Sequence, residues 1–176
     1  AGRTALVTGA GQNIGRGIVL MLAEAGANVV VNGRKNLAAV EEVANEAREL
    51  GVKALPILAD VGDHKAVERM VAEATEKLAP IDIAISNAGV RPRQAFHEIT
   101  VEDWHHVLNN NLSSAFYIAR CVLPGMQSRG WGRLINISGQ DGWKGLTNRA
   151  HNVTCKAGLF AFAKAIALEY GPYGIT

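Results

Sequence analysis

The chain has 176 residues, 48% of them hydrophobic and 19% charged, and a formal net charge of +2 at pH 7. These values are typical of one globular domain with its own core, and so small a net charge gives no basic face of the kind that binds nucleic acid. No apolar run approaches the roughly 18 residues of a membrane span, and the first residues, AGRTALVTGA, lack the layout of a signal peptide. Cys121 and Cys155 form neither a CxxC pair nor a disulfide framework, so we expect a cytoplasmic protein.

Short apolar runs alternate with longer amphipathic stretches along the chain. The expected strands are residues 4–8, 28–32, 53–59, 81–86 and 132–138. The expected helices are residues 14–26, 36–50, 63–79, 101–129 and 152–170, with Asp63 and Thr100 as N-caps and Gly26 and Gly51 as helix ends. The strands are apolar on both faces, as buried parallel strands are. We therefore predict an α/β fold, a doubly wound parallel sheet with helices on both faces, in a single Rossmann-like domain over residues 1–176.

A glycine-rich stretch, TGAGQNIGRG at residues 8–17, follows the first expected strand and opens a helix. In such sheets, ligands bind beyond the carboxyl ends of the strands. Glycines let the backbone turn sharply and approach a pyrophosphate, which then lies on the free N–H groups of the helix start. Gly9, Gly11 and Gly15 are the candidates for this contact, although glycines also serve any tight connection between a strand and a helix.

The second expected strand ends in NGRKN, residues 32–36. A carboxylate at this place would bind the ribose hydroxyls of NAD, whereas an arginine would accept the 2′-phosphate of NADP. No acid is present, but Arg34 and Lys35 are. These cations favour NADP, with NAD as the alternative cofactor; exposed cations at a strand end are also often only solvated.

Six motifs follow one another in a fixed order on the expected fold. They are TGAGQNIG (8–15), ADV (59–61), NAG (87–89), NNNL (109–112), RLINIS (133–138) and Lys156 with the two residues after it, KAG. In this set and order the chain resembles the short-chain dehydrogenase/reductase family over essentially its whole length, including the members similar to 3-oxoacyl-acyl-carrier-protein reductase.

The resemblance implies a role for each matched residue. The implied cofactor-binding residues are Gly9, Gly11, Asn13, Ile14, Gly15, Arg34, Asp60, Val61, Asn87, Ala88, Gly89 and Lys156. Asp60 would contact the adenine, Asn111 would be the active-site asparagine, and Lys156 would hold the nicotinamide ribose. The alternatives are structural: Asp60 as a helix N-cap, Asn87 as a bridge between strands, residues 109–111 as a polar helix face, and Lys156 as a solvated helix residue.

The resemblance also implies a small-molecule substrate with a hydroxyl or carbonyl group, no metal, and a homodimer or homotetramer formed through the helices at 101–129 and 152–170. The chain stops at YGIT, residues 173–176, where family members enter a sixth strand. We therefore expect the C-terminal part of the family fold, which carries most of the substrate recognition, to be absent from an apparently truncated domain.

Three positions depart from the family pattern. The middle glycine of the first loop is Asn13, and because asparagine tolerates left-handed backbone we expect cofactor binding to survive. The position of the catalytic serine, thirteen residues before the family's tyrosine, falls on Gly139 rather than Ser138, and the tyrosine position itself is Asn152. Asparagine cannot donate the proton that an alkoxide needs after hydride transfer, and a positioned proton donor contributes roughly 10²–10⁴ in rate.

Other residues near Asn152 are candidates for the missing proton donor. His151 titrates in the right range, but adjacent helix residues point about 100° apart, so it faces the site only if the helix begins at or after residue 152. Ser138 would need the strand to slip by one residue, and Gln140 and Asp141 follow the same strand. The catalytic candidates are Asn111, Lys156, His151, Ser138 and Asn152.

The loop VRPRQAF, residues 90–96, is more basic than the family usually shows. Arg91 and Arg93, with Arg149 and His151, would make the entrance positive and suit an anionic substrate; the alternative is exposed loop arginines without a ligand. Two functions from different classes fit the whole pattern. One is an NADP-preferring oxidoreductase with an altered catalytic set, and the other is a dinucleotide-binding protein without turnover that serves as a regulator or silent subunit. A third possibility is that Gly139 and Asn152 are engineered changes in an ordinary enzyme.

Overall fold

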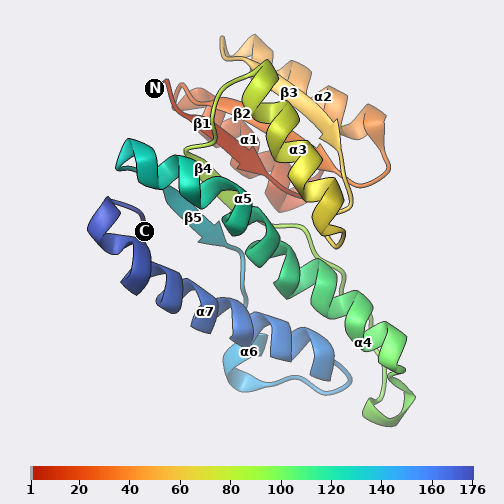
Figure 1. Ribbon diagram of the computed structural model, residues 1–176. Coiled ribbons are helices and arrows are strands. Elements are labelled where there is room, and N and C mark those ends of the chain that lie inside the picture. The colour runs from red at the N-terminus through yellow and green to blue at the C-terminus, as the bar shows by residue number, and fades with distance from the viewer. Residues whose placement is uncertain (1) are drawn as a thin grey trace.

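A parallel five-stranded sheet organises the chain (Figure 1). The computed structural model describes residues 2–176, and the strand order is β3-β2-β1-β4-β5. The strands are β1 (Thr4–Val7), β2 (Asn28–Gly33), β3 (Ala54–Leu58), β4 (Ile83–Ser86) and β5 (Arg133–Asn136). The order reverses between β1 and β4, and the loops that leave these two strands therefore diverge and open a crevice at the carboxyl edge of the sheet. The predicted doubly wound parallel sheet is confirmed.

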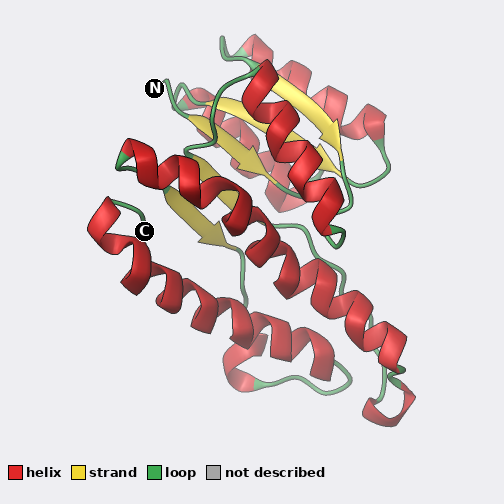
Figure 2. Ribbon diagram, viewed as in Figure 1, coloured by secondary structure: helices red, strands yellow, loops and turns green. Residues whose placement is uncertain are grey.

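Helices cover both faces of this sheet (Figure 2). The helices of the chain are α1 (Asn13–Glu24), α2 (Leu37–Glu49), α3 (His64–Lys77), α4 (Val101–Leu108), α5 (Ser114–Arg129), α6 (Asp141–Lys144) and α7 (Ala150–Tyr170). Short 3₁₀ turns lie at Phe96–Glu98 and Gly171–Tyr173. Among residues 2–176, no helix is long and apolar enough to cross a membrane.

The strands are apolar on both faces because both faces are covered. Successive strand residues point to opposite sides of a sheet. Val7, Val29 and Val31 accordingly pack against α1 and α2, and Leu6 and Val30 pack on the other face against α3 and α5. Partly buried side chains of α7 join this second cluster, so α3, α5 and α7 form one layer and α1 and α2 form the other.

The predicted helix caps are also confirmed. The Asp63 side chain accepts the backbone N–H of Lys65 at 2.9 Å at the start of α3. The Thr100 hydroxyl accepts the N–H of Asp103 at 3.0 Å, and the two residues form a capping box. Gly26 and Gly51 follow the last turns of α1 and α2.

The single helix expected over 101–129 is interrupted by a π-helical turn, Asn109–Ser113. Side chains in and next to this turn bond to the backbone: the Asn110 amide donates to the His106 carbonyl at 2.9 Å, and the hydroxyl of Ser114, the first residue of α5, donates to the Asn110 carbonyl at 2.8 Å. Such bonds compete with the regular helical ladder, and π turns are frequent at functional sites. The short helix α6 was not predicted, and the helix expected from residue 152 begins at Ala150.

The last residues lie along the free edge of β5. Ile175 forms a parallel bridge with Gly132, and the Leu134 N–H donates to the Thr176 carbonyl at 2.8 Å. This placement agrees with the expectation that the sequence YGIT leads into a sixth strand.

A pair of glycine substitutions tests how the end of α5 is made. Gly130 ends this helix with a φ of +65° and has open space around its missing side chain. Gly130→Ala should lower the free energy of unfolding by about 1–2 kcal/mol, because an L side chain is strained in left-handed backbone. Gly17→Ala, at an exposed and equally open position inside α1, should raise it by about 0.5–1 kcal/mol. Urea denaturation measures both, and an unchanged stability for Gly130→Ala would contradict the left-handed cap.

Candidate cofactor site and catalytic residues

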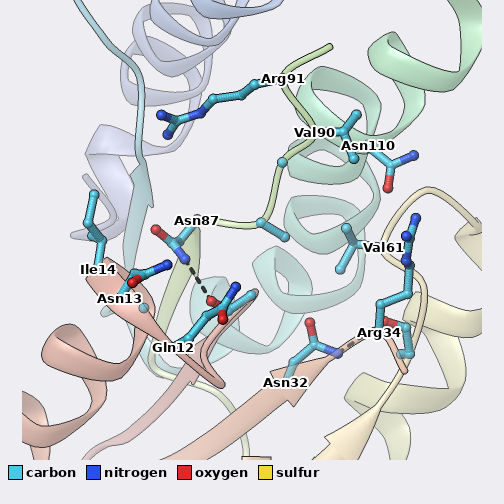
Figure 3. Close-up of a pocket in the computed structure, with 15 residues that line it drawn as sticks. Gln12, Asn13, Ile14, Asn32, Arg34, Val61, Asn87, Val90, Arg91 and Asn110 are labelled. Carbon is cyan, nitrogen blue, oxygen red and sulfur yellow. Dashed lines mark hydrogen bonds between the residues drawn. The ribbon is translucent and has the colours of Figure 1, made fainter. Parts of the chain in front are cut away.

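A cavity of about 420 Å³ lies beyond the carboxyl ends of β1, β2 and β4 (Figure 3). The predicted cofactor residues that line it are Gly9, Asn13, Ile14, Gly15, Arg34, Val61, Asn87, Ala88 and Gly89. The predicted residues Asp60 and Lys156 do not line it, and Gly11 lines an adjoining hollow of about 300 Å³ instead. The two hollows share Gly9, Gln12 and Arg34, so they form one continuous groove along the sheet edge.

The loop between β1 and α1 leaves the start of α1 free to bind an anion. The N-cap residue Gln12 makes no side-chain capping bond, and the first turn of α1 carries no acidic residue. Asn13 adopts a φ of +50°, so asparagine occupies the left-handed conformation as expected. A Cβ atom at Gly15 would overlap the Gly9 carbonyl oxygen, so only glycine fits there. Free N–H groups and the helix dipole together favour a phosphate at this point.

Asn87 both lines the cavity and bridges the loops that follow β1 and β4. Its side-chain amide donates to the Thr8 carbonyl at 2.9 Å and to the Gly9 carbonyl at 3.1 Å. The backbone N–H groups of Asn87 and Ala88 donate to the Thr8 hydroxyl at 3.0 and 3.1 Å. The structural alternative for Asn87 is therefore present together with its place in the cavity.

Asp60 and Asn32 shape the far side of the groove. The Asp60 carboxylate accepts the Gly62 N–H at 2.9 Å, so Asp60 forms a turn; the N-cap of α3 is Asp63. The buried Asn32 amide donates to the carbonyls of Ile57 and Ala59 at 3.3 and 3.2 Å and ties the ends of β2 and β3 together.

Six lining residues were not predicted to bind the cofactor. They are Gln12, Asn32, Ala59, Val90, Arg91 and Asn110. For Asn32 a signal was available, namely a polar residue that closes the apolar run VVVN. Gln12 lies inside the glycine-rich loop, and Asn110 is one residue before the predicted Asn111, so these two are neighbours of predicted residues.

Two exposed cations, Arg34 and Lys35, lie at the end of β2. Both line the groove, and neither forms an ion pair within residues 2–176. Their charge is therefore uncompensated by the protein at the place where the ribose phosphate of NADP was expected.

Asn111 and Asn152, which the resemblance places at the active-site asparagine and tyrosine positions, both bond to the backbone of Val90. The Asn111 amide accepts the Val90 N–H and donates to the Val90 carbonyl, both at 2.7 Å. The Asn152 amide donates to the same carbonyl at 3.3 Å. Both asparagines are buried, so their side chains hold the loop after β4.

Lys156 lies one helical turn after Asn152 in α7, and Ser138 lies in the segment after β5. The Lys156 ammonium donates to the Ile137 carbonyl at 2.5 Å, and the Ser138 hydroxyl donates to the Lys156 carbonyl at 2.8 Å. Burial lowers the pKa of Lys156 from its ordinary value, and the positive charge of Arg91 lowers it further. Gly139 has open space where a side chain would stand.

His151 lies completely inside the protein, with both ring nitrogens engaged. Its Nδ1 accepts the Asn152 N–H at 2.8 Å, so Nε2 carries the proton of the neutral ring and donates to the Gln94 side chain at 3.2 Å. The Gln94 amide in turn donates to Asp103 at 2.8 Å. Burial lowers the pKa of His151, and because α7 begins at Ala150 the condition under which His151 would face the site is not met.

These features together are those of an α/β protein with a groove suited to a phosphate-bearing ligand, and comparison with known proteins gives its family. Residues 3–176 match the family model described as short chain dehydrogenase. An acetoacetyl-CoA reductase from Allochromatium vinosum is 39% identical over 99% of this chain and 71% of its own length. A 3-oxoacyl-acyl-carrier-protein reductase from Staphylococcus aureus is 34% identical over the same shares of both chains. The chain belongs to the short-chain dehydrogenase family.

A solved structure supports the same assignment. The crystal structure of a short-chain alcohol dehydrogenase from Sinorhizobium meliloti 1021 superposes with a TM-score of 0.95 at 30% sequence identity, over 99% of this chain and 69% of the other.

The burial of a neutral His151 predicts a pH-dependent stability. In the unfolded chain this ring takes up a proton near pH 6.5, whereas the lowered pKa of the folded state resists protonation. The unfolded state then binds more protons, so the contribution of His151 to stability is lost as pH falls below about 6.5. Urea denaturation at pH 7.5 and 5.5 should show a smaller pH effect in His151→Gln than in the unmodified protein. The exposed His105→Gln is the matched control, and equal pH effects in His151→Gln and the unmodified protein would contradict a buried neutral ring.

Proposed function

We propose that the protein is an NADP-preferring oxidoreductase that acts on a hydroxyl or carbonyl group of a small molecule with an altered catalytic set. The observation that carries this proposal is the groove at the switch point between β1 and β4. It combines a helix start without an acidic residue, a glycine that no other residue can replace, and the unpaired cations Arg34 and Lys35. These are the groups that a phosphate-rich dinucleotide needs.

When bound, a nicotinamide cofactor supplies the hydride chemistry of the family. The chain's own residues have to bind it, orient the substrate and provide a proton. The start of α1 and Gly15 would hold the pyrophosphate, Arg34 the 2′-phosphate, and Val61, beside the turn that Asp60 makes, the adenine. Lys156 lies on the catalytic side, where the resemblance gives it the nicotinamide ribose.

Proton transfer is the step that this chain supports least. Asn111 and Asn152 have no proton to give to an alkoxide, and their amides already bond to Val90. The Ser138 hydroxyl is engaged with a carbonyl, and the His151 ring bonds to Gln94. Lys156 is then the proton-bearing group of this corner, and its lowered pKa makes it a better acid than an ordinary lysine. We expect slow turnover through this group or a water held by it.

A second function is favoured by the same bonds. Ser138, His151 and Asn152, which stand at or beside the changed positions 139 and 152, each bond to a group of the protein, which is the state expected of side chains without catalytic work. A dinucleotide-binding protein without turnover, acting as a regulator or silent subunit, is therefore the alternative proposal.

We also propose that the protein is a cytoplasmic homodimer or homotetramer. The support is an apolar groove of about 490 Å³ between α5 and α7, lined by Leu112, Ser113, Phe116, Tyr117, Gly158 and Phe162. These elements fall in the segments that the family resemblance gives to the subunit interface, and Phe116 and Phe160 are exposed on them.

Cofactor preference can be measured directly. NADPH should bind more tightly than NADH, and Arg34→Ala should weaken NADPH roughly 10-fold or more, since hydrogen bonds to charged groups contribute about 1.5–3 kcal/mol. NADH affinity should stay nearly unchanged. Arg69→Ala removes an exposed cation outside the groove and is the control. Equal affinity of the unmodified protein for both cofactors would refute the preference.

Restoring the family residues tests the altered catalytic set. Asn152→Tyr combined with Gly139→Ser should raise the rate of ketone reduction by on the order of 10²–10⁴, because it returns a positioned proton donor. Asn152→Phe with Gly139→Ala has nearly the same shape without the hydroxyls and should give no gain. Turnover over a carbonyl panel with NADPH is the measurement. An unmodified protein already as fast as the restored variant would show that another proton donor operates.

A further inference from the structure

The loop between Val90 and Gln94 begins at the cavity, which its first two residues line, and is fixed at both ends. At its start, Val90 is bonded through its N–H and its carbonyl to Asn111, and again through its carbonyl to Asn152. These partners come from the π turn before α5 and from the first turn of α7. The start of the loop is therefore held by two separate helices.

The end of the loop is held just as firmly. The Gln94 N–H donates to the Asn148 carbonyl at 3.0 Å, and its side chain lies between His151 and Asp103. Pro92 further restricts the backbone between the two ends. Because the backbone is fixed on both sides, the residue between Val90 and Pro92 starts from a defined position.

That residue is Arg91, and its side chain lines the cavity. Figure 3 shows Arg91 extending to the opposite end of the cavity from Arg34. Its guanidinium forms no ion pair or hydrogen bond within the described residues 2–176. The other groups expected at a positive entrance are arranged differently: Arg93 does not line the cavity, and His151 is buried.

The charges around Arg91 do not cancel. Burial is the main cause of the lowered pKa of the Lys156 ammonium, and the positive charge of Arg91 is the next one. The carboxylate that acts on Lys156 in the opposite sense is Asp141, at the start of α6. Two cations thus face one acid at the catalytic end of the groove, while the start of α1 and Arg34 offer separate sites for the cofactor phosphates.

We propose that Arg91 binds a carboxylate of the substrate, so that the protein acts on hydroxy or oxo acids rather than on neutral alcohols and ketones. This inference rests on the proposed function, since it names the substrate class of the same site. A guanidinium offers two parallel N–H donors that match the two oxygens of a carboxylate. Because the backbone of the loop is already fixed, only the exposed side chain of Arg91 has to be ordered when a carboxylate binds.

The test uses pairs of ligands in which a carboxylate is replaced by its uncharged methyl ester. Pyruvate, acetoacetate and levulinate, each beside its methyl ester, are titrated by calorimetry into the full chain with and without saturating NADPH. At least one oxo acid should bind 10-fold or more tightly than its ester. Arg91→Gln should abolish this difference, leave the ester affinity and NADPH affinity unchanged, and keep the circular dichroism spectrum. Arg93→Gln, an exposed loop arginine outside the cavity, should keep the difference, and Arg91→Lys should keep part of it.

Two results would overturn the inference: acids that bind no better than their esters, or an Arg91→Gln variant that loses NADPH affinity, which would place Arg91 in the cofactor site. A chain that binds no NADPH would speak against the proposed function instead. In that case the titrations without cofactor still decide the role of Arg91. A preference for acids that Arg91→Gln abolishes supports the inference, and the absence of such a preference overturns it.

Discussion

The hydrogen bonds of Thr8 and Asn87 hold the loops after β1 and β4 at a fixed separation. The candidate cofactor groove depends on that separation. Thr8 is buried at the end of β1, and its hydroxyl accepts two backbone N–H groups from the loop after β4. The Asn87 amide returns two bonds to the loop after β1. The backbones approach so closely that a Cβ atom at Gly9 would lie 2.9 Å from the Ala88 Cα. Replacing one partner would leave buried donors unpaired, which costs about 1–3 kcal/mol for each group.

Asn111 and Asn152, at positions that the resemblance makes catalytic, also form hydrogen bonds to the loop after β4. In the family a tyrosine hydroxyl is aimed at the substrate; here the shorter Asn152 amide ends on the Val90 carbonyl beside Asn111. Its neighbour His151 accepts a backbone N–H and reaches Gln94. A polar side chain this deep inside the protein needs a partner, and Asn152 and His151 find theirs in Val90 and Gln94, at the two ends of the loop after β4. Asn152 and His151 thus support that loop and its surroundings, and the charged groups nearby are Lys156, Arg91 and Asp141.

Local patterns in the sequence were enough to predict the sheet, its helices and the glycine-rich loop. A strand such as NVVVN is apolar on both faces wherever it is buried, and the glycines of residues 8–17 follow directly from the turn that they make. The π turn at Asn109–Ser113 was not predictable in this way, because the side chain of Asn111 bonds to Val90, 21 residues away in the chain. The bond that engages the His151 ring reaches Gln94 across 57 residues. Bonds of such range depend on the finished fold, and no periodicity or spacing records them.

Charge is distributed so that the groove is positive although the chain as a whole is nearly neutral. Some cations on the helices have acidic partners: Arg16 pairs with Glu46, Lys65 with Glu68 and Lys77 with Glu73. Arg34 and Arg91 have none within residues 2–176, and the start of α1 between them carries no acid in its first turn. Unpaired cations in a concave site act on a ligand more strongly than the same charges spread over an open surface. A net charge of +2 is thus compatible with a groove that attracts anions, because local attraction depends on where the unpaired cations lie.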